Sequence, residues 1–372
     1  MKSAFVLLLL VLSARSSLAI ETVKVGIALR VTPEINSFAP ALNRGIEYAE
    51  TVFETKNHQI AVELVKYPHK SGHESVEQAA RKIIADKVKY VLGGEMSDEA
   101  FALAETFHNQ KTLLMTPTSS NPFLTAGNPL VFRACFSDDQ VASLMAKYVA
   151  SLKHVKTIAV LHNTSNAYSD YLTNAFLDEF EKLNKGKDAV KISEFRYASE
   201  QPDFMSTVFR FKRENADLVL AFTLQETLKA FVTLAQKASF HPLYLGSDGW
   251  GTNESLIKSL PDFKGIRNAY WVEDSKATSV RAFKTGFEKK YGTPPDAWNA
   301  IAYDAATALF EAIAKAKNPH DPTEVAELLH SMTFKDGASS TSLKFNHHNT
   351  AVKPFYLYEV SKAGSKLVKE ME

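Results

Sequence analysis

Apolar and polar residues alternate along this chain in two different periods. Short apolar runs bounded by glycine, proline or polar residues are typical of buried strands, and longer segments with apolar residues at helical spacing are typical of amphipathic helices. The first part of the chain reads as strand 22–29, helix 39–55, strand 60–65, helix 74–87, strand 90–94, helix 97–110 and strand 112–115. Ser97 or Asp98 is expected to cap the last of these helices, because both are preferred cap residues.

A second series with the same alternation opens near residue 157. It reads as strand 157–161, helix 170–183, strand 190–195, helix 204–214, strand 218–222, helix 226–238 and strand 243–246, and then as helices 279–291, 297–316 and 323–332 and strands 343–345 and 355–358. Strands that alternate with helices form parallel sheets with helices on both faces. The pattern therefore predicts an α/β fold with two doubly wound parallel-sheet lobes.

The first 19 residues have the layout of a secretory signal peptide. Lys2 provides the positive charge, an apolar run follows at 4–12, and Ser17-Leu18-Ala19 places small residues where a signal peptidase cleaves. The alternative is a membrane anchor, but the run is shorter than the roughly 20 residues that cross a bilayer. No cysteine stands directly after the predicted cleavage site, which argues against a lipoprotein. We expect cleavage after Ala19.

Composition narrows the class of protein. A chain of 372 residues is long enough for two domains. Its 43 basic and 42 acidic residues nearly balance, so no electrostatic reason favours nucleic acid or an anionic membrane as a partner. Cys135 is the single cysteine of the sequence, so we expect no internal disulfide and interpret it as a core thiol.

The sequence lacks the common motifs of enzymes. It contains no HExxH, CxxC or GxSxG pattern. His347 and His348 are adjacent, so their side chains would diverge on a strand, and we expect these two and His162 to be solvated or capping residues. We predict no metal, no cofactor and no catalytic residue, and a protein that is not an enzyme.

Ligands of open α/β sheets bind beyond the carboxyl ends of the strands, beside helix N-termini. The residues at these positions in the first series include four with hydroxyl groups, Ser97, Thr118, Ser119 and Ser120. Hydroxyl groups at a helix N-terminus suit a carboxylate, and Asp248 in the second series suits an ammonium group. The set therefore predicts a cleft for a zwitterion, although each hydroxyl taken alone has the alternative role of a helix cap or a turn residue.

The three tryptophans divide by position. Trp250 lies next to Asp248 and is the best candidate for a pocket wall. Trp271 lies near a predicted crossover, and Trp298 lies on a predicted helix and is expected in the core.

Six ordered segments resemble the leucine/isoleucine/valine-binding proteins of bacterial ABC transporters. They are Tyr90–Thr125, Val131–Tyr148, TIAVLHNTSNAYSDYLTNAF, DFMSTVFRFKRENADLVLAF, LYLGSDGWG and AIAYDAATALF. The resemblance implies a type I periplasmic binding fold, in which three crossovers join two lobes and the ligand lies between them. Lobe 1 is then expected at 20–135 and 273–345, and lobe 2 at 136–272 and 346–372.

The resemblance also implies roles for individual residues. Ser97 corresponds to the hydroxyl that holds the ligand carboxylate, and Thr118 to Ser120 to the loop that contacts both charged groups. Tyr168 corresponds to the aromatic of lobe 2 that covers the ligand, and Asp248 to the acidic partner of the ammonium. Phe38 is expected to line the pocket from the first loop.

Two departures from the family pattern concern the ligand side chain. Glu95 stands where an aliphatic contact is expected, and Leu224 or Gln225 replaces an aromatic residue. A buried unpaired charge is costly, so Glu95 must pair with Arg30 or with another group, or recognise a basic or polar group on the ligand. The departures argue against assuming a branched aliphatic ligand.

The sequence therefore predicts an exported receptor that captures an amino acid or a similar carboxylate or amide and delivers it to an inner-membrane ABC permease. We expect a periplasmic monomer that does not span the membrane. A periplasmic sensor that presents ligand occupancy to a membrane receptor would use the same cleft and stays an open alternative. A periplasmic enzyme is disfavoured by the lack of a catalytic constellation.

Overall fold

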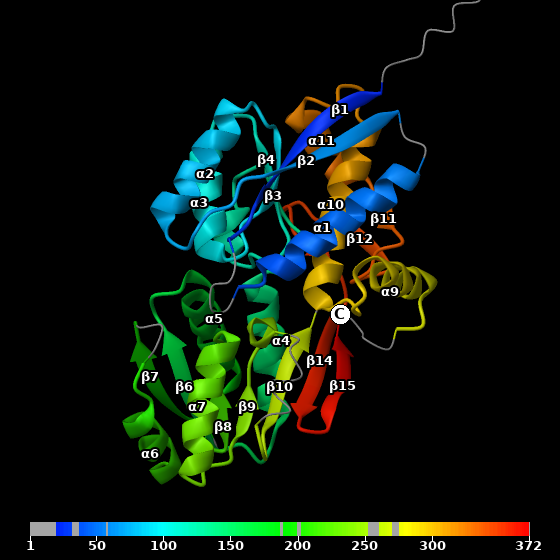
Figure 1. Cartoon of the computed structure of the whole chain (residues 1–372). Helices are drawn as coiled ribbons and strands as arrows, with labels where there is room; N and C mark the ends of the chain where they lie inside the picture. Colours follow the sequence, from blue (N-terminus) through cyan, green and yellow to red (C-terminus); the bar gives the residue numbers. More distant parts are fainter. Residues whose placement is uncertain are drawn as a thin grey trace, which may run out of the picture.

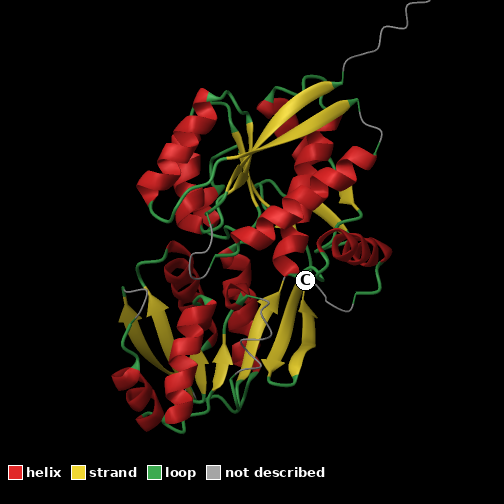
Figure 2. Cartoon of the chain, viewed as in Figure 1, coloured by secondary structure: helices red, strands yellow, loops and turns green. Residues whose placement is uncertain are grey.

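The computed structural model describes residues 20–31, 37–56, 59–186, 189–198, 202–251, 260–269 and 275–371. The predicted signal peptide and Trp271 lie outside this range. Two lobes are stacked one above the other, each with its own sheet between helices (Figure 1, Figure 2). The fold therefore has the two-lobed α/β architecture that the sequence pattern predicts.

Lobe 1 is built on a five-stranded parallel sheet in the order β2-β1-β3-β4-β5. Its strands are β1 (Glu21–Ala28), β2 (Ile60–Lys66), β3 (Tyr90–Gly93), β4 (Leu113–Thr116) and β5 (Val131–Arg133). Its helices are α1 (Ala39–Thr55), α2 (His73–Ala85), α3 (Ser97–Phe107), α9 (Thr278–Tyr291), α10 (Ala297–Lys315) and α11 (Pro322–Ser331), with the short 3-10 helix η1 (Pro122–Leu124). α1 and α10 pack together against one face of the sheet, and α2 and α3 cover the other.

Lobe 2 is built on a seven-stranded sheet in the order β15-β14-β10-β9-β8-β6-β7. Its strands are β6 (Thr157–Asn163), β7 (Lys191–Tyr197), β8 (Leu218–Leu220), β9 (Leu243–Leu245), β10 (Lys264–Ala269), β14 (Phe355–Ser361) and β15 (Gly364–Met371). Its helices are α4 (Asp138–Ser151), α5 (Ala167–Leu183), α6 (Met205–Arg213) and α7 (Gln225–Lys237), with the 3-10 helix η2 (Asp248–Trp250). β6 to β10 are parallel, and β14 and β15 add an antiparallel edge.

The chain crosses between the lobes at three places: after β5, between β10 and α9, and before β14. A small sheet of β11 (Phe334–Lys335), β12 (Ser342–Phe345) and β13 (Ala351–Val352) precedes the last crossover. Because β13 still pairs with β12, the chain leaves lobe 1 after Val352 and not after Phe345 as expected. The three crossovers agree with the predicted hinge.

Elements with strong local patterns lie close to their predicted bounds. α1 spans the predicted 39–55, where Pro40 fits the first turn and apolar residues face the core. The pattern did not predict β10 and β15, whose sequences KGIRNA and GSKLVKEM lack a continuous apolar run. These residues form strands because β10 pairs with β9 and β15 pairs with β14. Periodicity within a segment cannot reveal such pairing.

Candidate ligand-binding cleft

A small pocket lies between the lobes, at the carboxyl ends of strands from both sheets. It is lined by Phe38, Glu95, Met96, Ser97, Thr118, Ser120, Tyr168, Leu224, Asp248, Gly249 and Trp298. In this conformation it encloses about 20 Å³, which is room for about one water molecule. The lobes or the lining side chains must therefore move apart to admit a larger molecule.

Ser97 begins α3 at the lobe 1 wall of the pocket. It does not cap the helix: the cap position is Met96, and the Glu99 carboxylate accepts the backbone N–H groups of Glu95 (3.1 Å) and Met96 (3.3 Å). The expectation that Ser97 or Asp98 caps α3 is therefore wrong. Ser97 is 2% exposed, and its hydroxyl has no hydrogen-bond partner among the described residues.

The loop after β4 is clamped to the loop after β3 by hydroxyl groups. Thr118 donates to the carbonyl of Glu95 at 2.7 Å, and Ser119 donates to the carbonyl of Gly94 at 2.7 Å. Each hydroxyl keeps free lone pairs that can accept from a ligand donor. Thr118 and Ser120 line the pocket, whereas Ser119 is not among the lining residues.

Gly94 makes this loop arrangement possible. Its φ of +71° is a left-handed conformation, and a Cβ there would lie 2.7 Å from the Cβ of Ala100 in α3. Glycine therefore lets the chain turn sharply from β3 into α3 and brings the helix start to the pocket.

Lobe 2 contributes Tyr168 from the first turn of α5 and Asp248 from η2. The Tyr168 hydroxyl forms a short hydrogen bond with Ser247, and burial raises the pKa of Tyr168 well above its usual value, so the phenol stays protonated. A Cβ on Gly249 would lie 2.9 Å from the Tyr168 hydroxyl oxygen. The Asp248 N–H donates to the Asn268 side chain at 3.1 Å, which fixes the turn that presents Asp248 to lobe 1.

Glu95 is held by the start of α1 and not by Arg30. Its carboxylate accepts a short bond from the N–H of Phe38 and a 3.1 Å bond from the Ser37 hydroxyl, whereas Arg30 forms an ion pair with Glu99. Burial and the nearby charge of Glu99 raise the pKa of Glu95 to about 7, against the opposing effect of its hydrogen bonds. Glu95 therefore lines the pocket with a carboxyl group that titrates near neutral pH.

The structure corrects the role expected of Trp250 and adds a role to Trp298, which is 5% exposed and belongs to the core, as expected. Trp250 lies outside the pocket: its ring is 1% exposed, it donates to the Ala221 carbonyl at 2.9 Å, and it packs edge-on against Phe263. Trp298, expected in the core, lines the pocket and stacks on Phe38 with ring centroids 4.3 Å apart. Trp250 turns inward because the ring fits over Gly246, where a Cβ would lie 1.9 Å away.

Asp138 is a residue near the pocket that the sequence did not single out. It begins α4, is 1% exposed, and donates its backbone N–H to the carbonyl of Ser120 at 2.9 Å. Neither carboxylate oxygen has a hydrogen-bond partner of normal geometry within the described part of the chain. In the sequence, Asp138-Asp139 resembles an ordinary acidic helix start, which hides the burial.

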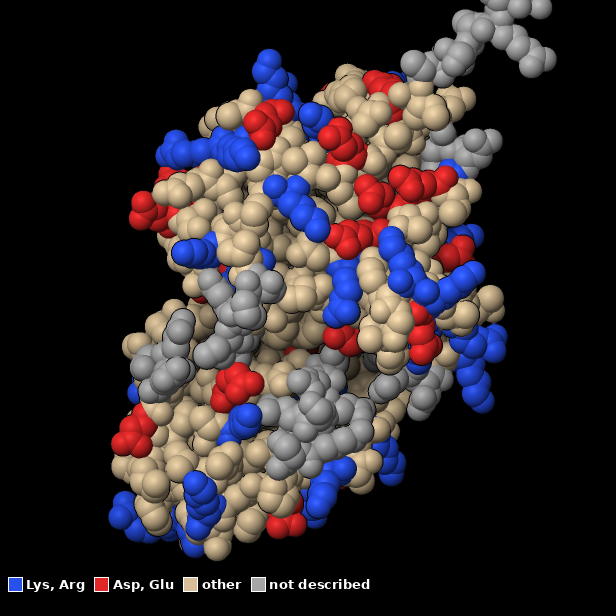
Figure 3. All heavy atoms as spheres, in the orientation of Figure 1, with Lys and Arg blue, Asp and Glu red and all other residues tan. Residues whose placement is uncertain are grey.

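A wider cavity of about 1120 Å³ adjoins the small pocket and shares Met96 and Leu224 with it. Its walls come from α2 and α3 of lobe 1 and from the starts of α5 and α7 in lobe 2. The space-filling view shows the outline narrowing between the lobes and both signs of charge scattered over the face seen (Figure 3). The cavity forms the outer part of the cleft through which a solute can reach the pocket.

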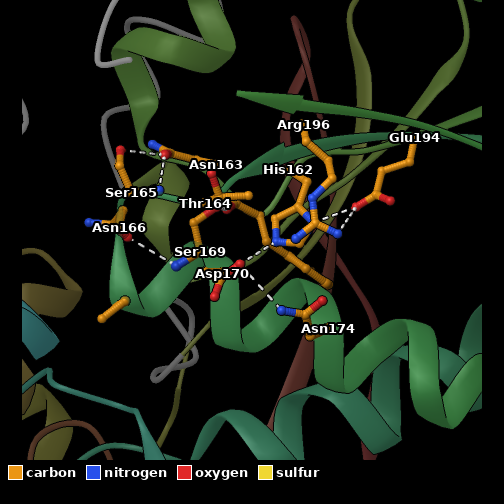
Figure 4. Close-up of polar contacts among 12 residues, drawn as sticks. His162, Asn163, Thr164, Ser165, Asn166, Ser169, Asp170, Asn174, Glu194 and Arg196 are labelled. Atoms are coloured by element: carbon orange, nitrogen blue, oxygen red, sulfur yellow. Dashed lines mark hydrogen bonds and ion pairs between the residues drawn. The ribbon is translucent and has the colours of Figure 1, made fainter. Parts of the chain in front are cut away.

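His162 lies behind the lobe 2 wall and is not the solvated or capping residue we expected. The ring is fully buried on β6 between two carboxylates, with Nε2 2.7 Å from Asp170 of α5 and Nδ1 in a short contact with Glu194 of β7 (Figure 4). Asn166 caps the same helix by accepting the N–H of Ser169 at 2.9 Å. These contacts fix the first turn of α5, which carries Tyr168.

Three further expectations from the sequence concern metal sites, the cysteine and membrane spans. No group of three His, Cys, Asp or Glu residues there could hold a metal ion. Cys135 is buried, and burial raises the pKa of its thiol to about 12, which agrees with the predicted core thiol. None of the helices found between residues 20 and 371, outside the gaps, has the length and apolar character needed to cross a membrane.

Known proteins with similar sequences and structures are binding proteins. The chain is 27% identical over 326 residues to a Leu/Ile/Val-binding protein homolog of Brucella melitensis, with 85% of each chain covered. It is 23% identical to a leucine-, isoleucine-, valine-, threonine- and alanine-binding protein of Pseudomonas aeruginosa, with 87% of this chain and 86% of that protein covered.

Solved structures show the same fold. The leucine-binding protein LivK of Thermotoga maritima superimposes with a TM-score of 0.84 at 24% identity, covering 94% of this chain and 99% of that one. A solute-binding protein of R. palustris in complex with benzoate gives 0.81 at 19% identity, covering 94% and 96%. The periplasmic binding protein family model matches residues 22–365. This chain is thus a member of the periplasmic binding protein family and has the type I fold.

Proposed function

We propose that this protein captures a zwitterionic amino acid between its lobes. The observation that carries the proposal is the Ser97 hydroxyl, buried without a partner among the described residues at the start of α3, in the same pocket as Asp248 of the opposite lobe. The helix dipole and the hydroxyl favour the ligand carboxylate, and Asp248 favours its ammonium group. A ligand that spans the two would draw the lobes together.

The relatives support this class of ligand, because their names state leucine, isoleucine, valine, threonine and alanine. The benzoate complex of a protein with the same fold supports a second candidate, a carboxylate without an amine. Asp248 favours the amino acid, since a carboxylate in the pocket repels an anion that brings no positive charge. Glu95 favours a ligand whose side chain carries a polar group over a purely aliphatic one.

The test is a thermal-shift screen of the twenty amino acids, benzoate and 4-methylpentanoate, followed by calorimetry. A ligand raises the melting temperature by mass action. An amino acid should give the largest shift, and 4-methylpentanoate, which is leucine without its amine, should bind more weakly than leucine. Tighter binding of a carboxylate without an amine contradicts the proposal.

We further propose that the mature protein is a periplasmic monomer that delivers its ligand to an inner-membrane ABC permease. The pattern of the first 19 residues and the family membership support export. N-terminal sequencing of protein from the periplasmic fraction should begin at Ile20. Deletion of the protein should abolish uptake of the labelled ligand; unchanged uptake with a lost response to the ligand favours the sensor instead.

A further inference from the structure

A buried acidic side chain without a partner is rare, because an ionised carboxylate needs hydrogen bonds or a positive charge when water is excluded. Among the described positions, neither carboxylate oxygen of Asp138 has a hydrogen bond of normal geometry, and the Ser120 hydroxyl that approaches it offsets its burial only in part. Its backbone is bonded to Ser120, which lines the pocket, so Asp138 lies directly behind the pocket wall. Tyr168 and Cys135 both feel the charges of Asp138 and Asp248, which places the two carboxyl groups in one cluster.

Four polar or charged groups act on the Asp138 carboxyl, and they come from η2, α4, β5 and the loop after β4. Asp248 of η2 and Asp139 of its own helix add negative charge, while Arg133 of β5 and the Ser120 hydroxyl act in the opposite direction. Arg133 donates to the carbonyls of Asn121 (2.7 Å) and Pro122 (3.1 Å). These bonds direct the guanidinium toward the loop after β4, and the carboxylate receives no hydrogen bond from it.

Burial, with the charge of Asp248, raises the pKa of Asp138 to about 8 despite Ser120 and Arg133. The ligand-free protein at neutral pH is therefore expected to keep this side chain neutral. A cation that arrives beside Asp248 changes the balance, because a positive charge favours the ionised form of nearby carboxyl groups.

We propose that Asp138 is a positioning residue of the cation site, which holds a proton in the empty cleft and releases it to solvent when the ammonium group of a ligand arrives. The O–H bond of the Asp138 carboxyl breaks, the proton goes to buffer, and the ligand charge replaces it, so the net charge of the buried cluster is conserved. Asp138 acts through Ser120 and Asp248. Its carboxyl group becomes negatively charged only when a bound cation stabilises that charge.

The exchange has a measurable signature. Because binding removes a proton, affinity must rise with pH up to about 8 and level off above it. Below that value the slope approaches about tenfold per pH unit, until the pKa of Asp138 in the complex is reached. Glu95 also titrates near neutral pH, but it lies on lobe 1, and any slope that it causes remains when Asp138 is replaced.

The inference rests on the proposed amino-acid ligand, and the experiment separates the two. Calorimetry with L-threonine, whose side chain carries the kind of polar group that Glu95 favours, at pH 6.5 in phosphate and in Tris gives the number of protons released from the difference in heats. The wild type should release about one proton more than Asp138→Asn. The steep rise of ligand affinity with pH that is expected of the wild type should be absent from this variant. Asp139→Asn removes the same charge one residue away at an exposed site and should still release this proton, because Asp139 is the smallest of the charges that act on Asp138.

Equal proton release by the wild type and Asp138→Asn overturns the inference and leaves the amino-acid site intact. If Asp138→Asn does not fold, carbon-13 NMR of the wild type replaces it: one aspartate carboxyl should titrate near pH 8 without ligand and lose this titration with L-threonine. No aspartate titrating above pH 7 in the free protein refutes the inference whether or not threonine binds. Failure of every amino acid to bind, with such an aspartate present, counts against the proposed function instead.

Discussion

Ser97→Ala should have opposite effects on ligand affinity and on the stability of the empty protein. The Ser97 hydroxyl is buried and has no partner among the described residues, so the ligand-free protein bears the cost of desolvating it. Removing a buried unpaired polar group relieves a penalty of about 1–3 kcal/mol, and part of this gain is offset by the small cavity left behind. We therefore expect the free energy of unfolding to stay equal or to rise by up to about 1 kcal/mol.

Affinity should fall in the same variant. A hydrogen bond to a charged group contributes about 1.5–3 kcal/mol, which corresponds to a loss of roughly 10- to 150-fold in affinity. Urea unfolding of the empty protein and calorimetry with the tightest ligand of the screen measure the two effects.

Ser169→Ala is the matched control. Ser169 is also 2% exposed in the first turn of a helix, but its hydroxyl donates to the Phe222 carbonyl at 2.6 Å. This variant should lose about 1–3 kcal/mol of stability, because the buried carbonyl is left unpaired. Unchanged affinity of Ser97→Ala, or a loss of stability equal to that of Ser169→Ala, would refute the assignment of Ser97 to the ligand carboxylate.

Two other variants test the surroundings of the pocket. The raised pKa of Glu95 means that the native protein binds this proton more tightly than the unfolded chain, so its contribution to stability is complete below about pH 4.5 and is lost as pH rises to about 7. Glu95→Gln should flatten this decline in urea unfolding at pH 4.5 to 8, and a decline as steep as that of the wild type contradicts it. His162→Gln breaks the links from β6 to Asp170 and Glu194 and should cost about 1–3 kcal/mol; the exposed His154→Gln is its control, and equal stability of the two variants would show that the buried links contribute little.

Local patterns account for most elements of this fold. Segments such as α1 and α10 carry an apolar stripe and fitting end residues, so their bounds follow from neighbours in the sequence. The edge strand β15 has alternating polar residues and exposed Leu367 and Val368. It becomes a strand by pairing with β14, which is a contact and not a property of its own residues.

The pocket also combines features that the sequence shows with features that only the folded structure shows. Hydroxyl groups at the ends of β3 and β4 and an acid after β9 are visible in the sequence, because parallel strands bring their carboxyl ends to one edge. Which of these groups face a ligand depends on contacts made across the chain. Met96 and not Ser97 is the cap of α3, and the Ser97 hydroxyl has no hydrogen-bond partner among the described residues.

What the sequence by itself determined is the compartment signal, the two α/β series and the polar strand ends that meet in the cleft. Tertiary structure alone decided that Trp250 fills the core, that Trp298 lines the pocket, and that Asp138 is buried beside Asp248. The physical reason is that periodicity and helix ends depend on residues a few positions apart. Burial and the pKa of a carboxyl group depend on tertiary packing, which joins residues as far apart in the sequence as Phe38 and Trp298, or Asp138 and Asp248.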